Sequence, residues 1–132
     1  MDLKILEIAS NTENNKIVKN FTHLAKNKNP TCGDEIEISL KIINDKIIDF
    51  GYQSKSCIYC QASASLLSIN IKNKKIKIMK KLIKDLEDFF SNSSNKFKIE
   101  WPQYKVLFKK KNLPRKGCLL LPFQTLKKAI KS

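Results

Sequence analysis

The cysteines are the most informative chemical groups of this sequence. There are four of them, at positions 32, 57, 60 and 118. Cys32 belongs to the string Pro30-Thr31-Cys32-Gly33-Asp34, so a carboxylate follows it by two residues. Thiolates and carboxylates are ligands that Zn²⁺ accepts in a tetrahedral site. Chemistry at these positions therefore depends on which elements bring the cysteines together.

A β-hairpin is expected between Cys32 and Cys57. Residues 35–42 alternate polar and apolar side chains, as a half-buried strand does. The apolar side chains of this strand's inner face are Ile36, Ile38, Leu40 and Ile42. Asn44-Asp45 is a turn pair, and residues 46–52 are the expected second strand. Because a hairpin returns its ends to one place, Cys32 and Cys57 should meet at the base of the sheet, within reach of Asp34.

Helix starts are expected at Cys57 and Cys118. The small residues of Ala62-Ser63-Ala64-Ser65 let the first helix approach another backbone closely. The last helix is expected over residues 119–131, with Pro122 tolerated only in its first turn. The dipole and free amides of a helix N-terminus lower a thiol's pKa and favour thiolate.

Cys32, Asp34 and Cys57 need one more donor to complete a tetrahedral site, and Cys118 can supply it. Cys32, Asp34, Cys57 and Cys118 are therefore a chemically sensible Zn²⁺ ligand set. The alternative is that these cysteines are ordinary buried side chains.

Cys60 and His23 are expected to lie outside the site. Cys57-Ile58-Tyr59-Cys60 is formally a C-x-x-C motif, but a dithiol oxidoreductase would need a βαβ context that the sequence lacks. Cys60 is predicted to be a packing or accessory thiol and not a metal ligand. His23 is the only histidine, so a metal site or a nucleophilic mechanism that depends on several histidines is not expected.

The other elements follow from local patterns. Residues 2–9 are expected to be a short helix, and residues 17–25 a strand leading into a turn at 27–30. A further helix is predicted by apolar residues at helical spacing, ending at 91–95. These residues are Met79, Leu82, Ile83, Leu86, Phe89 and Phe90.

The composition favours one ordered domain spanning residues 1–132. The chain weighs 15.2 kDa and is 42% apolar and 29% charged. No apolar run approaches the roughly 18–20 residues that span a bilayer. The start, Met1-Asp2-Leu3-Lys4, does not resemble a secretory signal. We therefore expect a cytoplasmic protein without membrane association, in which thiols stay reduced.

The net charge of +14 raises a second function class. A zinc-stabilised nucleic-acid-binding module would use Lys residues interspersed with Trp101, Tyr104 and Phe108 in the basic stretch 96–113. However, 25 of the 26 basic residues are Lys, and Arg115 is the only Arg, the type suited to bidentate phosphate contacts. Solvated lysines on ordinary surfaces are the simpler interpretation, and a nucleic-acid partner is not expected.

The motifs together resemble one known family. Asn29-Pro30-Thr31-Cys32-Gly33-Asp34, then Cys57 followed by Ala62-Ser63-Ala64-Ser65, then Cys118 opening the last helix, are similar to the NifU/IscU/SufU iron–sulfur cluster assembly proteins. The resemblance runs from about residue 29 to residue 130. The long interval between Cys57 and Cys118, Gly117 in place of a histidine ligand, and Arg115 three residues before Cys118 resemble the SufU-like branch.

The resemblance implies both a fold and a function. The fold would be α+β, a small antiparallel β-sheet covered by helices on one face. Cys32, Asp34, Cys57 and Cys118 would bind Zn²⁺ or an iron–sulfur cluster. Cys32, on a loop beside Gly33, is expected to accept sulfur from a cysteine desulfurase. The partners would be that desulfurase and recipient apo iron–sulfur proteins.

Overall fold

The computed structural model describes residues 3–91 and 101–131 of the chain. Its strands form one antiparallel sheet in the order β1-β2-β3-β4, with bounds β1 His23–Asn29, β2 Asp34–Ile43, β3 Lys46–Lys55 and β4 Lys74–Lys75. The helices are α1 Leu3–Ala9, α2 Ile58–Asn70, α3 Ile76–Ser91 and α4 Lys116–Lys131. Two 3₁₀ segments, η1 Pro102–Val106 and η2 Lys110–Arg115, precede α4.

The predicted hairpin is confirmed as β2 and β3. Asn44 and Asp45 both have positive φ, 51° and 63°, as the two-residue turns that match strand twist require. Ile36, Ile38 and Leu40 are buried on the inner face. Ile42 is only half-buried, because the pairing register shifts between Lys41 and Ile42.

The first strand lies further along the chain than predicted. Residues 17–22 are not in a strand, and β1 continues through the predicted turn to Asn29. All of β1 pairs with β2, from His23 opposite Leu40 to Asn29 opposite Asp34. Cross-strand pairing with β2 therefore holds the polar residues 26–29 in extended backbone, where local composition suggested a turn.

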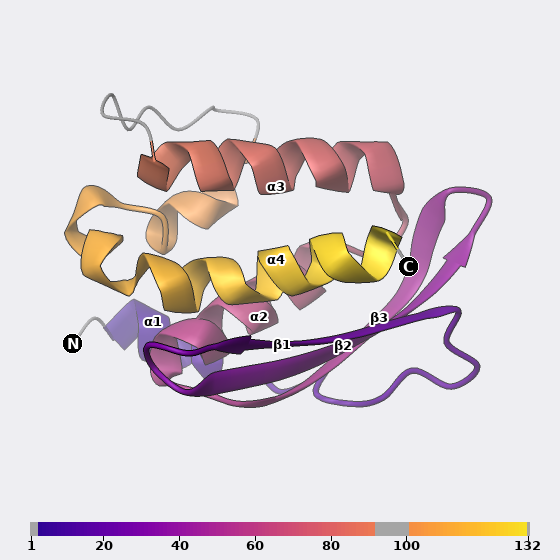
Figure 1. Ribbon diagram of the computed structural model, residues 1–132, viewed down its shortest axis with the longest axis horizontal. Helices are drawn as coiled ribbons and strands as arrows, with labels where there is room; N and C mark the ends of the chain where they lie inside the picture. Colours follow the sequence, from indigo (N-terminus) through magenta and orange to yellow (C-terminus); the bar gives the residue numbers. More distant parts are fainter. Residues whose placement is uncertain (1–2, 92–100, 132) are drawn as a thin grey trace.

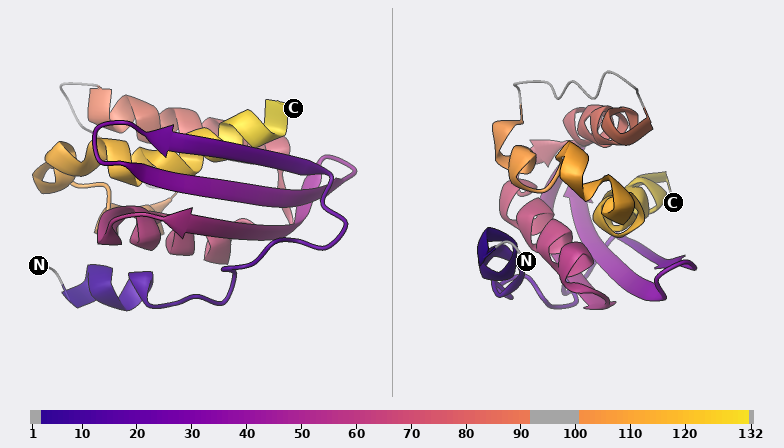
Figure 2. Two further views of the ribbon diagram at one scale, coloured as in Figure 1. Left: turned by 60° about the horizontal axis from the view of Figure 1, so that its bottom comes forward. Right: turned by 90° about the vertical axis from the view of Figure 1, so that its left-hand side faces the viewer.

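The helices lie on one face of the sheet (Figure 1). α4 packs on β1 and β2, and α2 packs on β3 beside α4. α1 packs against α2, and α3 packs on α4 on the side away from the sheet, as the end-on view in Figure 2 shows. The predicted α+β architecture, a small antiparallel sheet covered by helices on one face, is confirmed. The N-terminal ends of α2 and α4 lie at the same end of the sheet as the turn between β1 and β2.

The small residues of α2 bring it close to α4, as predicted. The Ser63 hydroxyl donates a hydrogen bond to the Leu119 carbonyl at 2.6 Å. The prediction for Pro122 was wrong, because α4 begins at Lys116 and Pro122 is the seventh residue of the helix. A proline inside a helix leaves carbonyls of the preceding turn without their usual donors. Pro122 removes the donor of the Cys118 carbonyl, four residues earlier. The next carbonyl, that of Leu119, accepts the Ser63 hydroxyl, and the buried surroundings of Leu119–Phe123 hold the helix together.

The predicted amphipathic helix is confirmed as α3. The six apolar residues that predicted it are all buried, Met79, Leu82, Ile83, Leu86, Phe89 and Phe90. The predicted end of this helix at 91–95 lies largely outside the described residues. Among the helices of residues 3–91 and 101–131, none has the length and apolar character needed to cross a membrane.

Candidate metal centre

The turn between β1 and β2 carries Cys32 at its exposed tip. The Gly33 amide donates to the Asn29 carbonyl at 2.8 Å, which closes the turn. Gly33 has a φ of +75°, a conformation that glycine adopts without the cost a side chain would add. The sequence Cys32-Gly33-Asp34 thus presents a thiol outward and returns the chain into β2.

Asp34, the first residue of β2, is buried, with 2% of its surface exposed. One carboxylate oxygen, Oδ1, accepts the backbone N–H of Cys57 at 2.8 Å. The other, Oδ2, lies 3.7 Å from the Cys57 Sγ. Asp34 therefore joins the two ends of the hairpin and holds the residue that begins α2, as the hairpin geometry predicted.

Cys118 reaches the same place from a distant part of the sequence. It lies in the first turn of α4, is 1% exposed, and its Sγ is 3.4 Å from the Sγ of Cys32. Ligand atoms of Cys32, Asp34 and Cys118 all lie within 4.8 Å of one another. The structure thus brings three of the four predicted ligands into one group, and Cys57 contacts that group through Asp34.

Two separations between the ligand atoms match those of a tetrahedral metal site. With Zn–S near 2.3 Å and Zn–O near 2.1 Å, neighbouring ligands of a tetrahedron are about 3.6–3.8 Å apart. The separations found are 3.4 Å between the sulfurs of Cys32 and Cys118 and 3.7 Å between Cys57 Sγ and Asp34 Oδ2. In the described part of the chain no Lys or Arg forms an ion pair with Asp34. A cation in this group would balance a carboxylate that is otherwise costly to bury.

The electrostatic prediction for Cys118 was wrong for the metal-free site. Its place in the first turn of a helix predicted a lowered pKa, whereas burial raises the pKa of Cys118 well above its usual value. Hydrogen bonds of the thiol with Asp34, Cys32 and Cys57 raise it further, because they favour the protonated form, and charge repulsion from Cys57 adds a smaller contribution. Desolvation and these hydrogen bonds outweigh the helix dipole at this position.

Comparison with known protein families identifies the family of this chain. Residues 2–98 match the model of the NifU-like N terminal domain. That match covers more than half of the chain. The chain belongs to the NifU-like N-terminal domain family. Cys118 lies beyond the matched residues, so its place in the site rests on the geometry above.

Individual relatives extend the similarity over most of the chain. The iron–sulfur cluster assembly scaffold protein IscU of Thermotoga maritima is 30% identical over 128 residues, which cover 96% of this chain and 89% of the relative. The zinc-dependent sulfurtransferase SufU of Bacillus subtilis is 28% identical, over 88% of this chain and 80% of the relative. In both cases the similarity covers most of this chain and most of the relative.

Solved structures share the fold. An iron–sulfur cluster assembly scaffold protein for the SUF system from Fervidobacterium islandicum superposes with a TM-score of 0.90 at 24% identity, over 98% of this chain and 96% of that one. A NifU-like N-terminal protein from Brucella abortus gives 0.86 at 20% identity, over 98% and 91%. At these identities the likeness establishes the fold.

His23 lies away from the thiols of this NifU-like domain. It begins β1, at the end of the strand opposite to Asn29, and its Nδ1 is 2.8 Å from the Thr22 hydroxyl. The group of ligand atoms consists of Cys32, Asp34 and Cys118 and does not include it. The expectation that histidine takes no part in the site agrees with this placement.

Two further side chains near the site had no assigned role in the sequence. The Asn29 amide nitrogen lies 3.9 Å from the Cys118 Sγ. The Arg115 guanidinium lies 5.2 Å from the ring centre of Tyr59, in cation–π geometry. An Asn side chain before a turn often accepts a hydrogen bond from the backbone two residues further on, so the contact of Asn29 with Thr31 could have been predicted from the sequence. The contact of Asn29 with Cys118 could not, because it requires α4 to pack beside the turn.

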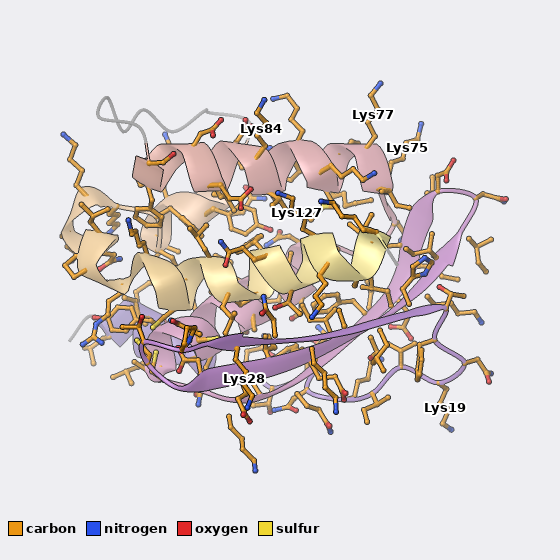
Figure 3. The ribbon with its side chains drawn as sticks, in the orientation of Figure 1. Lys19, Lys28, Lys75, Lys77, Lys84 and Lys127 are labelled. Carbon is orange, nitrogen blue, oxygen red and sulfur yellow. The ribbon has the colours of Figure 1, made fainter. Side chains whose placement is uncertain are left out.

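Of the three aromatic residues named in the basic stretch, Tyr104 and Phe108 are buried and cannot stack on bases, and Trp101 is half-buried. Tyr104 is 0% exposed and Phe108 1% exposed, and both rings pack against Phe123. Figure 3 shows labelled lysines projecting from separate elements, with Lys28 on the sheet side and Lys77 and Lys84 on the opposite side. The observations that supported a nucleic-acid module therefore have ordinary structural explanations, a buried aromatic cluster and dispersed solvated lysines.

Cys60 is buried in the core, whereas Cys32 is exposed. Burial raises the pKa of Cys60 to about 12, so the thiol stays protonated at neutral pH. At pH 8 a thiol with this pKa is ionised in about one molecule in 10,000. This environment is opposite to that of a reactive dithiol cysteine, whose pKa is lowered.

Alkylation of the native, chelator-treated protein checks this prediction. With iodoacetamide at pH 8, peptide mass spectrometry should find Cys32 modified and Cys60 unmodified, because only the exposed thiol is accessible to the reagent. In guanidinium chloride both should react. Labelling of native Cys60 as fast as Cys32 would contradict the burial and revive a dithiol role.

Proposed function

We propose that this chain is an iron–sulfur cluster assembly protein that holds Zn²⁺ or a nascent cluster and accepts sulfur. Cys32, Asp34, Cys57 and Cys118 are the proposed ligands. The observation that carries the proposal is the convergence of Cys32, Asp34 and Cys118 within 4.8 Å, with an exposed thiol beside two buried groups. A purely structural group of cysteines would not need its first member at the tip of an exposed turn.

Two of the four proposed ligands would stay bound to the metal, and the other two would exchange. Cys57 is the N-cap residue immediately before α2, and Cys118 lies in the first turn of α4, so both are fixed by helices that pack in the core. Cys32 is on a turn with glycine beside it. Asp34 offers an oxygen ligand, which binds soft metals less firmly than thiolate does. This arrangement keeps two sulfurs in place while Cys32 and Asp34 exchange.

The relatives support both forms of the proposal. One is named a scaffold and the other a zinc-dependent sulfurtransferase. For this chain we propose a cysteine desulfurase as the sulfur donor and apo iron–sulfur proteins as the recipients. We propose that the protein acts in the cytoplasm, where its thiols remain reduced. Zn²⁺ bound in this site would supply positive charge that keeps its cysteine ligands as thiolates at neutral pH.

Elemental analysis of the anaerobically purified full chain tests the proposal. About one zinc per chain supports the sulfur-acceptor form, and iron with acid-labile sulfide supports the scaffold form. Protein that binds neither zinc nor iron after reconstitution would overturn both. A Cys57→Ser variant tests the fourth ligand, since its metal content should fall together with that of the other ligand variants.

A further inference from the structure

Asn29 lies between the two cysteines that come from the most distant parts of the sequence. Its side-chain oxygen accepts the Thr31 amide at 3.2 Å, within the turn that carries Cys32. Its amide nitrogen lies 3.9 Å from the Cys118 Sγ, on the first turn of α4. One side chain therefore contacts both the loop of Cys32 and the sulfur of Cys118.

The orientation of this amide follows from its partners. A carboxamide has one end that only accepts hydrogen bonds and one end that only donates them. Thr31 presents a backbone N–H, so the oxygen of Asn29 must face it. The NH₂ group is then the end that faces the Cys118 sulfur, and it is a donor.

Gly117 leaves the space for this contact. A Cβ placed on Gly117 would lie 2.9 Å from the Asn29 nitrogen, 3.6 Å from its Cγ and 3.7 Å from its oxygen. Any side chain at position 117 would displace the Asn29 amide from the first turn of α4. The close approach of Asn29 to Cys118 therefore depends on glycine at this position.

We propose that Asn29 is a positioning residue for the Cys118 thiolate. It donates an N–H to that sulfur and ties it to the Cys32 loop, with Gly117 as the residue that makes room. This inference rests on the proposed function, because it concerns a metal held by Cys118. Hydrogen bonds to metal-bound sulfur tune the electron density of the ligand, and loss of such outer partners typically lowers metal affinity about 10–100-fold.

The substitution Asn29→Asp separates the donor from the turn. Aspartate keeps an oxygen that accepts the Thr31 amide, while an oxygen replaces the nitrogen that faces Cys118. Chelator competition with Zn²⁺ should show affinity about 10–100-fold weaker than in the wild type. The added carboxylate attracts a cation but also disfavours the neighbouring Cys118 thiolate, so the neutral variant Gly117→Ala, which displaces the donor without adding a charge, gives the test that is independent of charge.

A matched control lies two residues earlier on β1. Asn27→Asp introduces the same charge, and its oxygen still accepts the Lys28 amide that Asn27 now accepts at 2.9 Å. Its zinc affinity should equal that of the wild type. Gly117→Ala should weaken zinc binding in the same direction as Asn29→Asp, and the double variant should lose less than the product of the two effects.

A spectroscopic measurement excludes a merely structural effect. In protein loaded with Co²⁺ alone, the sulfur-to-cobalt charge-transfer band should move to longer wavelength in Asn29→Asp, because the sulfur loses a hydrogen bond. It should stay in place in Asn27→Asp. Wild-type zinc affinity and an unmoved band in Asn29→Asp would overturn this inference alone. A wild-type protein that binds neither Zn²⁺ nor Co²⁺ would overturn it together with the proposed function.

Discussion

In a Cys118→Ser variant, we expect the zinc content to fall close to zero and the zinc-dependent part of the stability to disappear. The sulfur of Cys118 is buried and lies 3.4 Å from the Cys32 sulfur, so it cannot be replaced by another thiol without moving α4. Serine is a poor zinc ligand at neutral pH. A metal that binds only the native state at 1,000 times its Kd stabilises it by about 4 kcal/mol. Urea unfolding with and without zinc, together with elemental analysis, measures both effects.

The appropriate control for Cys118→Ser is Cys60→Ala. Cys60 is equally buried, but it lies outside the group of ligand atoms. Cys60→Ala should lose some stability through lost core packing, yet it should keep its metal and the full increment of stability on adding zinc. If Cys118→Ser retained wild-type metal content and the same zinc increment, Cys118 would not be a ligand and the site would have to be redrawn.

The part of the site that the hairpin builds was predictable from local patterns. The alternation over 35–42 and the Asn44-Asp45 turn predict a hairpin, in which the start of β2 lies beside the end of β3. Asp34 and Cys57 therefore meet, as the hydrogen bond between them shows. The small residues of α2 likewise predicted a close helix contact, because only short side chains permit one.

The contribution of α4 depended on packing over long distances in the sequence. Cys118 joins Cys32 across 86 residues because α4 lies across β1 and β2, which no local pattern encodes. Cys118 entered the predicted ligand set because a tetrahedral site needed a fourth donor. Its raised pKa and its contact with Asn29 depend on burial and on neighbours that only the folded chain brings together.

The second large effect is expected at Cys32, where substitution by serine should abolish acceptance of labelled sulfur from a cysteine desulfurase. Cys32 is the exposed cysteine of the site, and the turn that carries it has glycine next to it. In the expected transfer, the Cys32 thiolate attacks the terminal sulfur of the donor's persulfide. A new S–S bond forms on Cys32, the donor's S–S bond breaks, and its electron pair leaves with the donor thiolate. No net oxidation occurs, so the step needs no further reactant.

Two variants distinguish the nucleophile from the metal ligand. Cys118→Ser loses the metal but keeps Cys32, so label that still reaches Cys32 in this variant shows that the thiol itself is the acceptor. Cys60→Ser should accept sulfur nearly as well as the wild type, because burial raises the pKa of Cys60 to about 12 and leaves almost no thiolate to attack. Radiolabelled cysteine supplied to the desulfurase, followed by non-reducing separation and peptide mapping, locates the sulfur. Label lost in Cys60→Ser but retained in Cys32→Ser would move the chemistry to the C-x-x-C motif, since a thiol that carries sulfur must be the one whose removal stops the transfer.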